Sequence, residues 1–218
     1  MSCAICGIRK ERRFCPAVHG RICPQCCGEQ REITLDCPSD CPYLLQARQH
    51  EKPRSVEELD PAVLFLPLEL GDGFVYEHEH LITGLSYALA RSARADRSIT
   101  DRDLIAGLSS LARRYERLVN SGLHYEEPIP GISQQAVISG LQAMVNEYRE
   151  AEQKHCGYTT LKDSELFKAL VFLVRMAYAR SSGRPKSRAF VDFLFAQFPA
   201  RESALVSPDQ GSGRIITP

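Results

Sequence analysis

The sequence predicts a mainly α-helical protein with a small cysteine-rich module at its amino terminus. Eight of the nine cysteines lie within the first 41 of the 218 residues. From about residue 77, apolar side chains recur at the three- to four-residue spacing that places them on one face of an α-helix. We therefore expect a cysteine-rich module at 1–50, a linker at 51–76, a bundle of about five helices at 77–199 and a disordered tail at 200–218.

The cysteines of the module have the spacing of metal ligands. Residues 3–6 (CAIC) and 23–26 (CPQC) are C-x-x-C knuckles, in which two thiolates reach one tetrahedral ion. Residues 37–41 (CPSDC) place two further thiols one helical turn apart. With Cys15 and Cys27 the count reaches eight, the full ligand set of two four-coordinate zinc ions. The sequence therefore predicts a small zinc-finger module.

We predict two zinc sites whose ligands interleave along the chain. Cys26 and Cys27 are neighbours whose side chains point in different directions, so we expect them to bind different ions. The first site would take Cys3, Cys6, Cys23 and Cys26, and the second Cys15, Cys27, Cys37 and Cys41. His19 is an alternative ligand that would leave Cys26 or Cys27 spare. An iron–sulfur cluster is the alternative metal group, because four thiolates also suit iron, although the C-x-x-C-G knuckles favour zinc.

The metal is expected to have a structural role. A segment of about 50 residues buries too little apolar surface to fold alone, and each structural zinc contributes roughly 10–16 kcal/mol. A site filled by four cysteines leaves no position for water or substrate. The sequence has no G-x-S-x-G motif, phosphate-cradling glycine loop or H-E-x-x-H pair. Residues 76–80 (YEHEH) and Cys156 fit a polar helix start and an ordinary helix-end thiol, so the protein is predicted not to be an enzyme.

The cysteine spacing over residues 3–41 resembles that of cross-braced two-zinc fingers of the HIT and MYND type. The early C-x-x-C and the final C-x-x-x-C steps match, whereas the lone Cys15 and the doubled Cys26 and Cys27 depart from those patterns. The amino-terminal block is also similar to that of bacterial proteins with a cysteine-rich head and a helical body. Fingers of this type mostly mediate protein–protein contacts, and some act beside nucleic acid. The resemblance thus implies an interaction role, and it does not extend to residues 55–218.

The segment between the module and the bundle carries weaker signals. Residues 49–55 are polar and contain a proline, which indicates a linker. Ser55 and Glu58 have the spacing of a capping box and predict a short helical turn. The stretch at 63–76 contains an apolar run and a Gly-Asp-Gly turn, and is interpreted as either a hairpin or an irregular lead-in to the bundle.

Five helices are predicted from their apolar faces and their caps. They begin after residue 76, at the capping box of Thr100 and Asp103, at Ser133, at Leu161 and at Ala189. The fourth, residues 161–179, is apolar on most sides, so we expect it to be central. Three of the helices contain an Ile-x-Gly-Leu sequence, with the glycines at 84, 107 and 140. Because a helical glycine costs about 1 kcal/mol relative to alanine, we expect close helix–helix contacts there.

The charges of the chain balance, with 27 Lys and Arg against 27 Asp and Glu, so no overall field attracts nucleic acid or anionic membranes. Two local basic clusters remain: Arg9, Lys10, Arg12 and Arg13 in the module, and Arg180, Arg184, Lys186 and Arg188 between the last two helices. One interpretation is contact with phosphates, and the other is solvated surface loops. Eight thiolates and two zinc ions would leave the module nearly neutral, which favours the second interpretation.

The leading hypothesis is a zinc-binding, non-catalytic interaction protein whose module or bundle docks a protein partner. The wide apolar faces also permit a homodimer through the bundle. A nucleic-acid-associated factor and an iron–sulfur redox protein are the alternatives. The chain shows neither a signal peptide nor an apolar run of 18 residues, so we expect a cytoplasmic location without membrane association.

Overall fold

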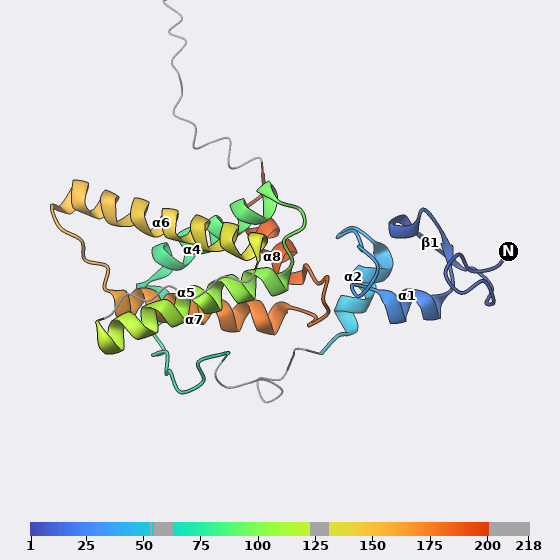
Figure 1. The fold of residues 1–218 in the computed structure, drawn as a ribbon, viewed down its shortest axis with the longest axis horizontal. Coiled ribbons are helices and arrows are strands. Elements are labelled where there is room, and N and C mark those ends of the chain that lie inside the picture. The colour runs from blue at the N-terminus through green and yellow to red at the C-terminus, as the bar shows by residue number, and fades with distance from the viewer. Residues whose placement is uncertain (53, 55–62, 123–130, 201–218) are drawn as a thin grey trace, which may run out of the picture.

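A cysteine-rich module and a helical bundle lie next to each other along the long axis of the molecule (Figure 1). The computed structural model describes residues 1–52, 54, 63–122 and 131–200. The module contains β1 (Arg13–Cys15), the 3₁₀ turn η1 (Pro16–Val18), β2 (Gly20–Ile22), α1 (Pro24–Gln30) and α2 (Pro42–His50). The remainder contains α3 (Phe74–Glu77), α4 (Glu79–Ala95), α5 (Asp101–Ser121), α6 (Ile132–Cys156), α7 (Asp163–Arg180) and α8 (Ala189–Gln197). The predicted fold class, a mainly α chain with a cysteine-rich amino-terminal segment, is confirmed.

The module is built around a short antiparallel ribbon and its own cysteines. β1 and β2 pair with Cys15 opposite Gly20, and α1 begins directly after β2. The buried cluster of the module consists of Cys3, Cys15, Ile22, Cys23, Cys26, Cys27 and Leu35. Only two of these seven residues are not cysteines, so aliphatic packing contributes little to the interior of the module.

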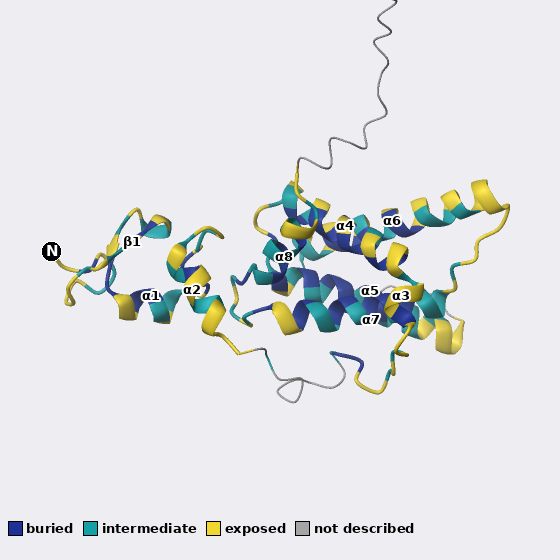
Figure 2. Ribbon diagram, turned by 180° about the vertical axis from the view of Figure 1, so that it is seen from behind, coloured by how far each residue is buried: buried dark blue, intermediate teal, exposed yellow. Residues whose placement is uncertain are grey.

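The bundle helices begin and end where local side chains supply backbone partners. The predicted capping box is present at the start of α5, where the backbone N–H of Thr100 donates to Asp103 at 3.0 Å. The same helix ends at Gly122, which has a φ of +69°. α5 makes its most extensive contact with α7, which is buried on most sides and runs along the lower edge of the bundle in Figure 2. The predicted fourth helix is present and largely buried, although it lies at one edge of the bundle in this view. None of the described helices is long and apolar enough to cross a membrane.

The three helical glycines mark places where α6 approaches its neighbours. A Cβ atom built on Gly107 of α5 would lie 2.8 Å from the Cγ1 of Val137 on α6. One built on Gly84 of α4 would lie 2.9 Å from the Cε of Met144. Gly140 of α6 faces α4 in turn, with a built Cβ 2.6 Å from the Ser92 hydroxyl. The predicted close helix–helix contacts are confirmed at all three positions.

The lead-in to the bundle is irregular rather than a hairpin over the residues that the structure describes, 63–73. Leu64 and Phe65 are buried against the bundle although they belong to no helix or strand. Arg175 of α7 holds this segment, because its guanidinium donates to the carbonyls of Leu64, Phe65 and Leu68 at 3.0, 2.6 and 2.8 Å. Arg175, the one charged residue between Ala169 and Ala179 of α7, therefore binds backbone oxygens. The helical turn predicted from Ser55 and the predicted tail after residue 200 lie outside the described residues.

Candidate metal centre

Four cysteine sulfur atoms converge in the module. The Sγ atoms of Cys3, Cys6, Cys23 and Cys26 all lie within 4.8 Å of one another. Cys3, Cys23 and Cys26 are at most 3% exposed. A tetrahedral zinc ion with Zn–S bonds of about 2.3 Å holds its four sulfurs about 3.8 Å apart. The residues predicted as the first ligand set therefore form a cluster that could hold a metal ion.

Backbone N–H groups around each knuckle point toward these sulfurs. Gly7 has a φ of +65°, and its N–H donates to the Cys3 carbonyl at 2.8 Å, which closes the first knuckle. The N–H of Cys23 donates to the Cys3 Sγ at 3.1 Å, and that of Cys26 donates to the Cys23 Sγ at 3.4 Å. Cys23 is also the N-cap of α1, with Pro24 in the first helical turn. The start of α1 thus fixes the second knuckle.

The same surroundings change the acidity of the thiols. Burial alone would raise the pKa of Cys3, but backbone N–H donors outweigh it and lower this pKa to about 6. Burial and the three neighbouring sulfurs raise the pKa of Cys26 to about 12. The Arg9 guanidinium lies 3.9 Å from the sulfurs of Cys23 and Cys26. Four thiolates at this spacing repel one another, so a divalent cation would favour the fully deprotonated set.

The other four cysteines of the module surround a separate small cavity. Cys15, Cys27, Cys37 and Cys41 all line a space of about 10 Å³ beside α2. Burial, together with the nearby thiolates of Cys41 and Cys15, raises the pKa of Cys37. Within the described residues, these four sulfurs do not reach the mutual spacing of the first cluster. Cys26 belongs to the first cluster, whereas Cys27 lines the small cavity.

The remaining candidate ligands lie apart from both sets. His19 is exposed, has a φ of +48° and ends η1, and it neither joins the first cluster nor lines the small cavity. His78 packs against Phe74, with ring centroids 4.5 Å apart, at the break between α3 and α4. Cys156 is exposed at the end of α6. These positions fit the interpretation of residues 76–80 as a helix start and of Cys156 as a helix-end thiol.

The first basic cluster is split between the sulfurs and the surface. Arg9 and Arg13 lie beside the cysteines, with the Arg13 guanidinium 3.5 Å from the Cys27 Sγ. Arg13 also lies over the ring of Tyr43, 4.5 Å from its centroid. Lys10 and Arg12 are exposed. Two of the four cations for which phosphate contact was one interpretation, Arg9 and Arg13, therefore lie against thiol sulfur.

The second basic cluster joins the bundle to the module. Arg184 donates to the carbonyls of Gly28 and Arg31 at 3.2 and 2.8 Å. The Lys186 ammonium binds the Thr34 carbonyl and the Asp36 carboxylate, both at 2.9 Å. The other two members stay within the bundle, with Arg188 donating to the carbonyls of Arg97 and Ile99 and Arg180 lying 3.7 Å over the ring of Phe193. These contacts contradict the interpretation of this segment as a solvated loop, because two of its four cations bind the module and the other two bind within the bundle.

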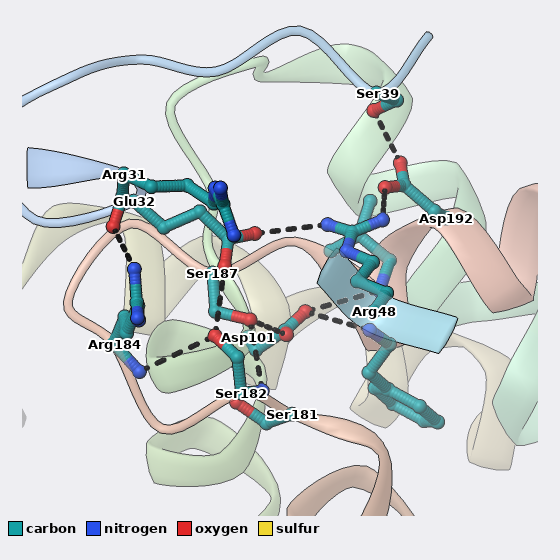
Figure 3. A network of polar contacts seen from close by, with 12 residues as sticks. Arg31, Glu32, Ser39, Arg48, Asp101, Ser181, Ser182, Arg184, Ser187 and Asp192 are labelled. Atoms are coloured by element: carbon teal, nitrogen blue, oxygen red, sulfur yellow. Dashed lines mark hydrogen bonds and ion pairs between the residues drawn. The ribbon is translucent and has the colours of Figure 1, made fainter. Parts of the chain in front are cut away.

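Glu32 is the centre of this interface (Figure 3). It is 1% exposed and has a φ of +53°. One carboxylate oxygen accepts from Arg48 of α2 at 2.9 Å, and the other accepts from the Ser182 hydroxyl at 2.9 Å. The Glu32 carbonyl also accepts from the backbone N–H of Lys186 at 2.8 Å. Nothing in the local sequence around Glu32 indicates this role, since its partners on the bundle lie about 150 positions away.

Two aspartates complete the polar network in Figure 3. Asp192 of α8 accepts from Arg48 at 2.7 Å and from Ser39 at 2.6 Å, which ties α8 to the module. Asp101, fully buried at the start of α5, accepts from Ser187 at 2.6 Å and from the first N–H groups of α8 at 3.1 Å. Burial raises the pKa of Asp101, although these hydrogen bonds act in the opposite direction. The loop between α7 and α8 is therefore held from both sides.

Comparisons of the chain with protein-family models, with curated proteins and with solved structures find no match. The resemblance to HIT and MYND fingers thus rests on the cysteine spacing. The metal-binding cluster and the interface rest on the geometry of this chain.

Proposed function

We propose that this chain is a zinc-stapled, non-catalytic interaction protein. Zinc folds the module, and the module is held against the bundle and contacts a protein partner. The observation that carries the proposal is the convergence of the four sulfurs of Cys3, Cys6, Cys23 and Cys26 within 4.8 Å. Four thiolates complete a tetrahedral ion and leave it no open position for a substrate, which favours a structural metal.

The sulfur spacing favours a single ion over an iron–sulfur cluster. In a cluster the cysteine sulfurs bind different irons that are bridged by sulfide, which separates them more widely than four ligands on one ion. A mutual spacing within 4.8 Å suits ligands that share one centre. Zinc fits a four-thiolate tetrahedral site of this kind, and structural zinc sites of this composition are closed.

We propose a second zinc at the cavity surrounded by Cys15, Cys27, Cys37 and Cys41. Support comes from the gathering of these four thiols around one small space, where Cys37 lies close enough to Cys41 and Cys15 for their charge to help raise its pKa. The Arg13 guanidinium beside Cys27 would offset part of the charge of four thiolates. Two structural zinc sites would explain how a module whose buried cluster is mostly cysteine is stable.

Elemental analysis and an absorption spectrum of native protein test the metal assignment. We expect a colourless protein with about two equivalents of zinc, since eight thiolates match two tetrahedral ions. Cys23→Ser should lower the zinc content through the first site and Cys37→Ser through the second, whereas Cys156→Ser should leave it unchanged. A brown protein with visible absorbance contradicts the proposal. So does a total zinc content that is unchanged in Cys23→Ser.

The partner surface that we propose lies on the module. Ile8, beside the first knuckle, is 88% exposed, and Phe14 on β1 is 57% exposed. Large exposed apolar side chains of this kind are typical of docking surfaces when they gather beside polar groups. Lys10 and Arg12 lie between them in the sequence and are exposed, which favours a protein partner with an acidic rim. The internal contacts of Arg184, Lys186 and Arg188 make a general nucleic-acid role less favourable.

Co-purification with matched variants tests the surface. A partner recovered with the natural protein should be lost with the double variant Ile8→Ser and Phe14→Ser and retained with Tyr158→Ser, a change of another exposed aromatic residue on the bundle. Zinc content serves as the folding control. A partner that both variants retain contradicts the module surface. If no partner is recovered and light scattering shows a dimer, self-association through the bundle is favoured instead.

A further inference from the structure

A cavity of about 560 Å³ lies where the module meets the bundle. Its walls come from the end of α2 and the chain that follows it, and from the loop between α7 and α8. The charged residues that line it are Arg48, Glu51, Lys52, Arg54, Arg180 and Arg184. Five of these six are cationic. The volume lies within the range of about 300–1,000 Å³ found for small-molecule sites.

The guanidinium groups of this cavity are held in place without losing their charge. Arg54 lies over the ring of Tyr178 and Arg180 over that of Phe193, each 3.7 Å from the ring centroid. Arg184 is fixed by the carbonyls of Gly28 and Arg31 rather than by a carboxylate. Rings and carbonyls orient a cation but do not neutralise it. Within the part of the chain that the structure describes, no carboxylate pairs with these three arginines, so their positive charge is available to the cavity.

Arg48 is the exception, and it shows how the cavity is assembled. Its two terminal nitrogens bind Asp192 and Glu32 at 2.7 and 2.9 Å, which places the end of α2 against the bundle. Ser182, another residue of the cavity wall, binds the second oxygen of Glu32. The two walls are thus joined through Glu32, which lies beneath the cavity and does not line it. The cavity exists only while the module is docked.

We propose that this cavity binds a small molecule that carries two or more phosphate groups. Guanidinium forks match phosphate oxygens with paired hydrogen bonds, and oriented arginines lose less entropy than free ones on binding. Several cations within one cavity, against the one carboxylate of Glu51, favour a multiply charged anion over a single carboxylate. The volume suits a nucleotide-sized or sugar-phosphate ligand. This site is distinct from the metal cluster and from the proposed partner surface on the module.

Calorimetric titration of the zinc-loaded full chain with inorganic triphosphate, and then with ATP, tests the proposal. We expect saturable binding at one site, weakened about tenfold or more by Arg54→Gln and by Arg180→Gln, since each removes charge-assisted hydrogen bonds. Arg91→Gln, which changes an exposed arginine of α4, should leave the affinity unchanged. Zinc content measured on each variant shows that the module remains folded.

The variant Glu32→Ala distinguishes anion binding by a preformed cavity from attraction by net charge alone. The change removes a negative charge, so attraction by net charge alone would strengthen anion binding. Loss of the contacts to Arg48 and Ser182 would separate the walls, so we expect weaker binding instead. Stronger binding in Glu32→Ala, or equal losses in Arg91→Gln and Arg180→Gln, overturns the proposal. Binding of a single-stranded oligonucleotide that triphosphate does not displace would also overturn it, and would assign the cations to a nucleic-acid backbone.

Discussion

Glu32 is buried and charged, and its backbone adopts the left-handed conformation that is unusual for a residue with a side chain. A buried carboxylate is tolerated when all its hydrogen-bonding capacity is met by well-placed donors. Arg48 and Ser182 each donate to one carboxylate oxygen here, and the backbone N–H of Lys186 donates to the Glu32 carbonyl. A single side chain thereby joins α2, the turn after α1 and the loop before α8.

We predict that Glu32→Ala releases the module from the bundle. The change leaves Arg48 and Ser182 without their shared acceptor, and the breakage of a buried pair costs about 3–5 kcal/mol. Small-angle scattering should show a larger radius of gyration, with zinc content unchanged. Glu29→Ala, a change of an exposed carboxylate on the neighbouring α1, is the matched control and should keep the compact form. An unchanged radius in Glu32→Ala would show that the remaining contacts suffice.

Asp101 performs the capping of α8 that its own N-cap residue, Arg188, does not provide. We predict that Asp101→Ala lowers the free energy of unfolding by about 3 kcal/mol, because two buried N–H groups and the Ser187 hydroxyl lose their acceptor. Urea denaturation followed by circular dichroism measures the change. Asp72→Ala, at an exposed carboxylate, should alter stability by less than about 0.5 kcal/mol. Equal stability of the two variants would contradict the capping role.

At the scale of helices, glycine sets how closely α6 approaches α4 and α5. The consequences of adding a methyl group differ among the three sites, because the neighbouring atoms differ in freedom to move. Gly84 faces the flexible end of Met144, and Gly140 faces the Ser92 hydroxyl. Gly107 faces the branched Val137, with both its Cβ and its Cγ1 within 3.1 Å of a built methyl carbon. A β-branched side chain has little freedom at χ1, so α5 and α6 would have to separate.

We predict that Gly107→Ala destabilises the bundle by about 1–3 kcal/mol, because overpacking outweighs the gain of about 1 kcal/mol in helix propensity. Gly84→Ala is the control and should be nearly neutral, since Met144 can move aside. Val137→Ala combined with Gly107→Ala should recover part of the loss, and chemical denaturation of the four proteins completes a double-mutant cycle. An increase in the free energy of unfolding of Gly107→Ala would contradict the prediction, because it would mean that α5 and α6 can separate without loss of stability.

At the scale of the whole molecule, two parts with different sources of stability share one interface. The bundle has a continuous aliphatic and aromatic core across α4 to α8, whereas the buried cluster of the module is mostly cysteine. Burial of apolar surface stabilises the bundle without any ion. The module lacks a comparable apolar core, so we expect metal–ligand bonds to supply most of its stability.

We therefore predict that removal of the metal with a strong chelator unfolds the module and spares the bundle. Hydrogen exchange should show loss of amide protection over residues 1–41 and retained protection in α5 and α7. Arg48 is carried by α2 of the module, so the anion affinity of the cavity should fall in the same experiment. Restored protection after addition of zinc is the control for reversibility. Persistent protection of the module without metal would contradict a role for metal in its folding.

Much of the local architecture could be read from the order of residues. The C-x-x-C knuckles and the capping box at Thr100 depend on neighbours within a few positions, and each is found where expected. The same holds for the glycines of α4, α5 and α6. The choice between a hairpin and an irregular segment at 63–73 was not readable, because Arg175, more than 100 positions later, decides it.

The sequence by itself determined the helical class of the chain, the cysteine cluster and the caps, since short-range spacing and periodicity control these features. Only the tertiary structure decided that Arg184 and Lys186 dock the module, that Glu32 is buried between two parts of the chain, and that a cationic cavity forms at their junction. The physical reason is that charged side chains look alike in sequence whether solvent or a distant partner surrounds them. Their roles are set by contacts across about 150 positions, which exist only after the chain has folded.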